Sequence, residues 1–214
     1  MIAIFRIFFV MTLLAIPFIM FLGFILRTSP KEESLDDDLI DDLADEVSDL
    51  EDELIPMDVH EMKILSWQPT PAKRSSKYVR GYLSTIFQEK LIAYARHSNG
   101  TTQCLYTTTS EGSYAFLSRG ADTKVFLSGK HWGTIHDGKV LRIVDGQVVC
   151  SLSYDTAFRG VILKNGEEIV SFYKGDKEIL TDRFFTMINQ LDEADNEHIL
   201  ILSLYVLLFK FVKK

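Results

Sequence analysis

The stretch that decides the fold lies close to the C-terminus and reads Ile199-Leu-Ile-Leu-Ser-Leu-Tyr-Val-Leu-Leu-Phe209. Acidic residues precede it and Lys210 follows it, which suits the two ends of a helix dipole. Such a helix is apolar around its whole circumference, so it must be surrounded by protein or by lipid. Its eleven residues rise only about 17 Å, which is too short for a bilayer core of about 30 Å. We therefore expect this helix to run through the middle of the domain.

The chain before this helix predicts a β-sheet made of consecutive hairpins. Four turn dipeptides punctuate it, at Asn99-Gly100, Asp137-Gly138, Asp145-Gly146 and Asn165-Gly166. They favour type I′ turns, in which both central residues have positive φ. Ten candidate strands lie between such turns, at residues 78–87, 90–97, 102–109, 113–118, 124–127, 132–136, 140–144, 148–154, 158–163 and 169–173. Short turns imply antiparallel pairing, and so many strands favour a closed barrel or a sandwich over an open sheet.

The N-terminus predicts a membrane anchor. Residues 7–26, with Ile7 first and Leu26 last, contain no charged residue and would form a helix about 30 Å long. The stretch exceeds the apolar core of a signal peptide and lacks a small-residue cleavage site, which favours an uncleaved single-pass anchor. Basic residues lie on both sides of it, so the charge rule leaves open on which side of the membrane the C-terminal domain lies.

The net charge of −7 conceals a strongly acidic segment between the anchor and the sheet. Residues 32–53 hold thirteen acidic residues and no basic one, whereas residues 54–214 hold 20 bases and 17 acids. The near-neutral remainder gives no electrostatic reason to expect nucleic acid as a partner. We therefore divide the chain into an anchor at 1–31, an acidic linker at 32–56 and a β-domain at 57–214.

Apolar residues recur at helical spacing within the acidic linker. The stripe consists of Ile40, Leu43, Val47, Leu50 and Leu54, which predicts an amphipathic helix. Two interpretations are open. The linker is either a docking helix, whose stripe meets a basic surface of this chain or of a partner, or a solvated spacer that holds the domain off the membrane.

The run of hairpins followed by one apolar helix resembles the tubby C-terminal-like superfamily, which includes the phospholipid scramblases and the plant LURP-one-related proteins. The resemblance covers about residues 75–214. It rests on Val125-Phe-Leu-Ser-Gly-Lys-His-Trp-Gly-Thr-Ile135, on Arg183-Phe-Phe-Thr-Met-Ile-Asn189 and on the acidic-then-apolar stretch 191–209. It implies a mostly β fold, a closed antiparallel barrel with the final helix along its axis.

The resemblance also implies two binding sites. Tubby-type domains bind phosphoinositides through basic residues, and an acid-free stretch here holds Lys73, Arg74, Lys77 and Arg80. The same residues also suit a solvated linker. Scramblases carry an acidic calcium-binding segment before their final helix, where this chain has Asp192, Glu193, Asp195 and Glu197. Their spacing departs from that of the family, and they also suit the N-terminus of a helix.

No catalytic, cofactor or metal motif stands out in the sequence. Neither G-x-S-x-G, H-E-x-x-H nor a Walker loop is present. Cys104 and Cys150 either form one disulfide or are two buried thiols. We expect no enzyme and no cofactor, but a membrane-tethered interaction module that presents its barrel to anionic lipid head groups or to a protein partner. The alternative is a phospholipid scramblase or lipid-transfer protein that uses its C-terminal helix.

Overall fold

The computed structural model describes residues 30–66, 68–72, 78–154, 159–173, 182–188 and 193–211. The predicted anchor at residues 7–26 lies outside the described residues. Within the described ranges, no helix combines the length and the apolar character that a membrane span needs. The contacts of the chain divide it into two compact units, Met1–Leu39 and Ile40–Lys214. The second unit contains the whole sheet.

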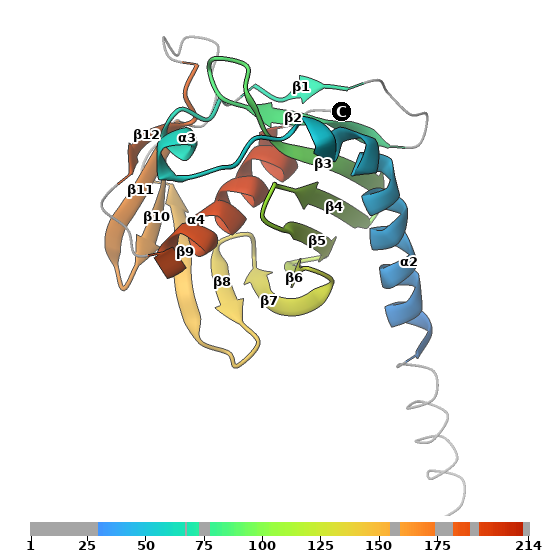
Figure 1. The fold of residues 1–214 in the computed structure, drawn as a ribbon. Coiled ribbons are helices and arrows are strands. Elements are labelled where there is room, and N and C mark those ends of the chain that lie inside the picture. The colour runs from blue at the N-terminus through green and yellow to red at the C-terminus, as the bar shows by residue number, and fades with distance from the viewer. Residues whose placement is uncertain are drawn as a thin grey trace, which may run out of the picture. The chain divides into compact units, whose positions relative to one another are not determined.

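In the part of the chain that the structure describes, three helical regions accompany a single sheet (Figure 1). The helices are α2 (Pro30–Val47), followed by the 3-10 helix η1 (Ser48–Glu53), then α3 (Val59–Lys63), and α4 (Glu193–Tyr205), followed by the π-helix η2 (Val206–Phe211). The strands are β1 (Thr70–Pro71), β2 (Val79–Ser84), β3 (Lys90–Asn99), β4 (Thr102–Thr108), β5 (Ser113–Arg119), β6 (Asp122–Leu127), β7 (Lys130–His136), β8 (Val140–Ile143), β9 (Val148–Tyr154), β10 (Arg159–Lys164), β11 (Glu167–Tyr173) and β12 (Phe185–Ile188).

The twelve strands lie in the sheet in the same order as in the chain, and each neighbouring pair is antiparallel. Each of the ten predicted strands overlaps one strand from β2 to β11, so the predicted hairpins are confirmed. At Asp137-Gly138 and Asn165-Gly166 both residues have positive φ, as a type I′ turn requires, whereas at the other two dipeptides only the glycine does. Sequence analysis missed β1 and β12.

The C-terminal helix forms the centre of the hydrophobic core. Every side chain from Ile199 to Leu208, including that of Ser203, is at most 6 % exposed. Figure 1 shows α4 on the inner side of the curved sheet. The helix shares one buried cluster with strand residues such as Phe116 and Leu141. Because a fully buried apolar side chain contributes about 1.5–3 kcal/mol, this helix supplies a large part of the hydrophobic stabilisation. The expected enclosure of the helix within the domain is confirmed.

The expectation of a closed barrel is wrong. β1 and β12 are the two ends of the sheet, and no ladder joins them. Residues 65–66 bridge the seam instead, because the Ser66 amide donates to the Ser84 carbonyl (2.8 Å) and the Phe184 amide donates to the Leu65 carbonyl (2.7 Å). β1 has only two residues, and Pro71 has no amide hydrogen, so this strand cannot extend a ladder towards β12.

Truncating the central helix tests its role in the core. Leu202 is fully buried, so Leu202→Ala should lower the free energy of unfolding by about 2–5 kcal/mol through lost burial and a residual cavity. Val148→Ala is a matched control, because Val148 is 57 % exposed, and it should change stability by less than about 0.5 kcal/mol. Urea denaturation of the full chain in mild detergent, followed by circular dichroism, measures both values. Equal effects of the two substitutions would contradict the core assignment.

Candidate functional site

The acidic segment is docked on the β-domain through its apolar stripe. We define the arm as residues 40–53, the part of α2 from Ile40 onwards together with η1. Ile40, Leu43, Val47 and Leu50 are 8 %, 0 %, 0 % and 6 % exposed, and η1 contacts β3. We predicted either a docking helix or a solvated spacer. The structure shows a docking helix, and the surface on which it docks belongs to this chain.

The surface beneath the arm lies on the outer face of the sheet and combines two alanines with two larger polar side chains. The register of β2 and β3 pairs Arg80 with Ala95 and Tyr82 with Ala93, which places these four residues on one face. Both alanines are fully buried although the central helix covers the opposite face. We call these four residues the docking face. Residues 91–95 form an apolar run without alternation, which is typical of a strand covered on both sides.

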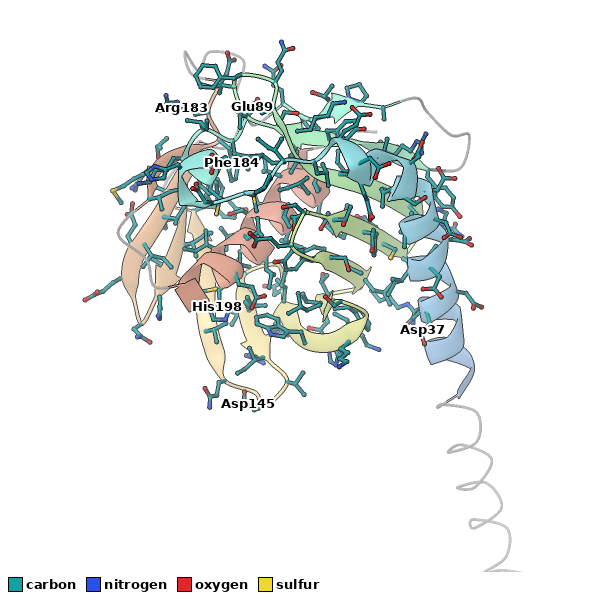
Figure 2. The ribbon with its side chains drawn as sticks, in the orientation of Figure 1. Asp37, Glu89, Asp145, Arg183, Phe184 and His198 are labelled. Atoms are coloured by element: carbon teal, nitrogen blue, oxygen red, sulfur yellow. The ribbon has the colours of Figure 1, made fainter. Side chains whose placement is uncertain are left out.

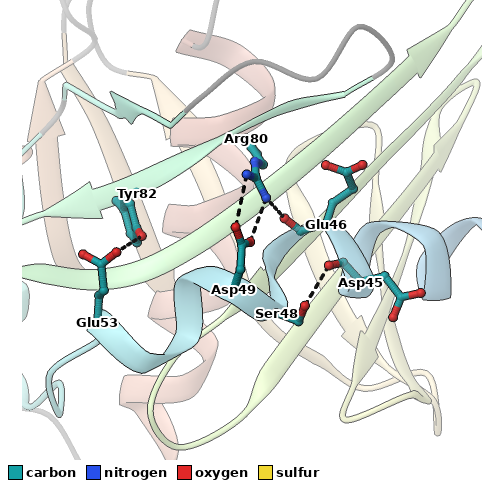
Figure 3. A network of polar contacts seen from close by, with 7 residues as sticks. All are labelled: Asp45, Glu46, Ser48, Asp49, Glu53, Arg80 and Tyr82. Carbon is teal, nitrogen blue, oxygen red and sulfur yellow. Dashed lines mark hydrogen bonds and ion pairs between the residues drawn. The ribbon is translucent and has the colours of Figure 1, made fainter.

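Arg80 makes the main polar contact between the docking face and the arm (Figure 3). Its Nη1 donates to the Glu46 carbonyl (2.6 Å) and to Asp49 Oδ1 (2.7 Å), and its Nη2 donates to Asp49 Oδ2 (3.2 Å). This bidentate pairing of guanidinium and carboxylate fixes the orientation as well as the position of the arm. The Arg80 side chain is only 17 % exposed, against 61 % for Asp49.

A second polar cluster holds the C-terminal end of the arm. The Tyr82 hydroxyl donates to Glu53 Oε1 (3.1 Å), and the Lys90 ammonium forms an ion pair with the same carboxylate. The Lys90 ammonium also lies 4.2 Å from the centre of the Tyr82 ring. The hydrogen bond from Lys90, and then that from Tyr82, lower the pKa of Glu53. Burial, followed by the bond to Glu53, raises the pKa of Tyr82.

Apolar burial outweighs the polar contacts in holding the arm. A fully buried apolar side chain is worth about 1.5–3 kcal/mol, whereas Asp49, the carboxylate that pairs with Arg80, is 61 % exposed, so water screens this ion pair. Along the arm itself, Asp41 and Asp45, and likewise Asp45 and Asp49, stand four residues apart, and each such like-charge pair costs about 0.2–0.5 kcal/mol. The helix of the arm therefore depends on docking, and the polar contacts set its register.

The described residues line hollows on the surface of this unit. One, of about 490 Å³, lies where the arm meets β2 and is lined by Asp42, Asp45, Glu46, Ser48, Asp49, Tyr78 and Arg80. Another, of about 400 Å³, lies at the seam and is lined by Ser66, Gln68, Thr70, Ser84, Thr85, Ile86, Gln88, Lys90 and Asp182. The carboxylates make the first hollow unfavourable for an anion. Among the described residues, no three His, Cys, Asp or Glu side chains are placed to hold a metal ion.

The predicted basic site is only partly within the described residues. Lys73, Arg74 and Lys77 lie outside them, so their grouping stays a prediction. Arg80 lies on β2, where the arm occupies its guanidinium. Sequence analysis missed the pairing of Arg80 with Asp49, because the two residues are 31 positions apart and no local pattern links them.

The predicted acidic site is described only at Glu197. Asp192 and the side chains of Glu193 and Asp195 lie outside the described residues, although Glu193 begins α4. Glu197 is half-buried on α4. Burial raises the pKa of Tyr114 to about 12, and the charge of Glu197 acts in the same direction. Glu197 therefore lies close to the sheet, and calcium binding stays a prediction.

Both cysteines are buried, Cys104 on β4 and Cys150 on β9. Cys104 is fully buried and Cys150 is 2 % exposed, and no disulfide joins them. We predicted either one disulfide or two buried thiols, and the structure shows two buried thiols.

Placing a charge on the stripe tests whether burial holds the arm. Leu43→Asp puts a carboxylate at a fully buried position, so the arm should undock and its helix should melt. Hydrogen exchange of the arm amides should accelerate at least ~10-fold, which corresponds to about 1.4 kcal/mol, while the sheet amides stay protected. Asp41→Asn, on the exposed face, is the control and should leave the arm protected. A protected arm in Leu43→Asp would show that the stripe does not hold it.

A pH titration tests the polar cluster at the end of the arm. The folded pKa of Glu53 lies below 4.5, so its contribution to docking is present above pH 4.5 and is lost as the pH falls through the folded value. The NMR titration midpoint of the Glu53 carboxyl should move up towards 4.5 in Lys90→Met and stay unchanged in the control Lys63→Met. If the titration midpoint of Glu53 is unchanged in Lys90→Met, Lys90 is not the cause of the lowered pKa of Glu53.

Comparison with protein-family models, with curated proteins and with solved structures finds no match to this chain. The resemblance to the tubby C-terminal-like superfamily therefore rests on the sequence pattern alone, and the site is described from its own residues.

Proposed function

We propose that this protein is a membrane-tethered, non-enzymatic interaction module. The observation that carries the proposal is the docked arm. The arm follows the predicted N-terminal span and is part of the folded domain, because its stripe is buried on the docking face. A span that leads into such an arm would attach the β-domain itself to the bilayer, because the arm belongs to the same compact unit as the sheet. A folded domain held at the bilayer suits a role in binding.

A protein partner is favoured over anionic lipid head groups. Arg80, the described member of the predicted basic set, is engaged by Asp49 and Glu46. The solvent side of the arm carries exposed carboxylates at Asp41, Asp45, Glu51 and Asp52. A membrane surface rich in anionic lipid is negatively charged, so these carboxylates oppose close approach to it. They suit a partner with a basic surface.

The burial of the C-terminal helix weighs against the alternative of a scramblase or lipid-transfer protein. To enter a bilayer, α4 would have to leave the sheet and expose its inner face. In lipid the helix itself would stay out of water, but the buried strand residues that it covers, such as Phe116, Leu141 and Phe172, would lose that cover. Each buried apolar side chain contributes about 1.5–3 kcal/mol, so the combined loss over the inner face would exceed the 5–15 kcal/mol that typically stabilises a domain. Release of the helix would therefore unfold the domain.

Reconstitution into vesicles tests the proposal. The full chain should float with the vesicles after an alkaline carbonate wash, and a variant lacking residues 7–26 should stay in the soluble fraction, with or without anionic lipid. The same vesicles carrying fluorescent lipid should show no flip beyond that of empty vesicles. Flotation of the deletion variant would contradict the anchor, and lipid flip by the full chain would favour the alternative.

A further inference from the structure

The hollow at the seam is lined mainly by neutral polar side chains. Its volume of about 400 Å³ lies within the range of roughly 300–1,000 Å³ that is typical of small-ligand pockets. The lining comes from the segment before β2, from the end of β2 with the loop that leads into β3, and from Asp182. Most of these residues carry a hydroxyl or an amide group, which donates as well as accepts hydrogen bonds: Ser66, Gln68, Thr70, Ser84, Thr85 and Gln88.

Some of these polar groups make no hydrogen bond within the part of the chain that the structure describes. Ser84 is the clearest case, because it is only 5 % exposed and still lines the hollow. Among the described residues, no side chain or backbone group bonds to the Ser84 hydroxyl or to the side-chain amide of Gln88. A nearly buried polar group without a partner is costly. A ligand in the hollow would supply the partner.

Gln88 has an unfavourable backbone conformation at the point where it lines the hollow. Its φ of 70° is uncommon for any residue other than glycine. The loop imposes this conformation, because the Gln88 amide donates to the Thr85 carbonyl (2.9 Å) and Thr85 Oγ1 accepts from the amides of Phe87 and Glu89 (3.2 Å each). Glycine would fit the same loop without strain. The loop geometry therefore does not explain the glutamine, and strain of this kind is typical of binding sites.

The charges at the hollow favour a neutral ligand over an anion. Lys90 and Asp182 are the charged residues in the described lining, and they have opposite signs. The Lys90 ammonium already forms an ion pair with Glu53. An anion would have to compete with Glu53 for Lys90, and Asp182 would repel it. A neutral ligand meets neither obstacle.

The backbone at the hollow is already paired, which weighs against an extended peptide as the ligand. Peptides that add to a sheet need strand amides and carbonyls without partners. Here the Ser84 carbonyl accepts from the Ser66 amide (2.8 Å), and the Thr85 amide donates to the Glu89 carbonyl (2.9 Å). The hollow therefore offers side-chain hydroxyls and amides rather than a free strand edge.

An exposed aromatic residue belongs to the same loop. Phe87 stands between Ile86 and Gln88, which both line the hollow, and it is 68 % exposed. An aromatic ring offers a flat apolar surface. A sugar ring has C–H groups that pack on such a surface and hydroxyl groups that donate and accept hydrogen bonds. The polar lining and the nearby ring together match these two properties.

We propose that the hollow at the seam binds a neutral hexose. The hydroxyl of Ser84 and the side-chain amide of Gln88 form hydrogen bonds with the sugar hydroxyls, and the ring of Phe87 packs on the C–H groups of the sugar. This site goes beyond the proposed function, because every residue of it lies in the β-domain and none belongs to the predicted anchor.

An NMR titration of the full chain tests the proposal, in a detergent whose head group is not a sugar. Glucose, galactose and mannose are added separately. The amide signals of residues 84–90 should shift with at least one of them, while those of β9 and β10 stay in place. The methyl glycosides of the same sugars distinguish two sources of the ligand. Shifts with a methyl glycoside identify the terminal residue of a glycan, whereas shifts with the free sugar alone identify a free hexose.

Replacing Gln88 separates binding from folding. Gln88→Gly removes the amide and relieves the backbone strain, so the Kd of the sugar should rise at least ~10-fold, which corresponds to about 1.4 kcal/mol. The midpoint of thermal unfolding should stay unchanged or rise. Asn165→Gly is the matched control, because Asn165 also has positive φ (52°) but lies outside the lining, and it should leave the Kd unchanged. Ser84→Ala should weaken binding without loss of the fold.

Three results would overturn the proposal. The first is the absence of shifts at residues 84–90 with all three sugars. The second is an unchanged Kd in both Gln88→Gly and Ser84→Ala. The third is a set of shifts at these amides with inorganic phosphate or with triglycine but with no sugar, because the hollow would then be a site for an anion or for a peptide.

Discussion

The burial of the C-terminal helix against the inner face of the sheet is the contact on which the rest of the structure depends. Hairpins joined by short turns determine which strands pair, but a curved sheet of this size also needs material to cover its concave face. The apolar circumference of α4 and η2 provides that cover, because the residues from Ile199 to Leu208 are buried on all sides. Since this helix follows all the strands that it covers, the core forms only when the strands and the helix are both present. Figure 2 shows the side chains that fill the space between the helix and the strands.

The same sheet carries a second, smaller contact on its outer face. Large side chains such as Phe116 point inwards to the helix, whereas small ones such as Ala93 and Ala95 point outwards to the arm. The difference in size lets a helix lie close to the strands on the outer side. Charge then determines which helix fits, because Arg80 and Lys90 flank the alanines and pair with Asp49 and Glu53. The acidic composition of the arm is therefore complementary to the surface that it covers.

Sequence alone predicted the features that depend on local patterns. Turn dipeptides located the hairpins, uniform apolarity located the central helix, and a helical stripe located the arm. Closure was predicted wrongly, because β1 is two residues long and the seam is bridged by residues 65–66, which no periodic pattern marks. The ion pair of Arg80 and Asp49 was also missed, since it depends on tertiary packing. The unbroken apolar run at residues 91–95 was the available sign that both faces of β3 are covered.

The contact of the central helix with the inner face and the contact of the arm with the outer face differ in how much free energy is needed to open them. Opening the inner contact unfolds the domain, whereas opening the outer one releases only a short acidic helix whose own charges repel one another. Local release of weakly held segments is the usual basis of regulated binding. Release of the arm would therefore leave the scaffold intact, because the central helix stays buried.

Hydrogen exchange of the full chain, measured in detergent and in bilayers, tests the central claim most directly. If the sheet encloses the C-terminal helix, the amides of residues 199–208 exchange only through global unfolding, as slowly as those of β3 to β5, and the bilayer does not change their rate. Exchange of these amides that is much faster than that of the sheet, or that slows only when lipid is present, would contradict the account.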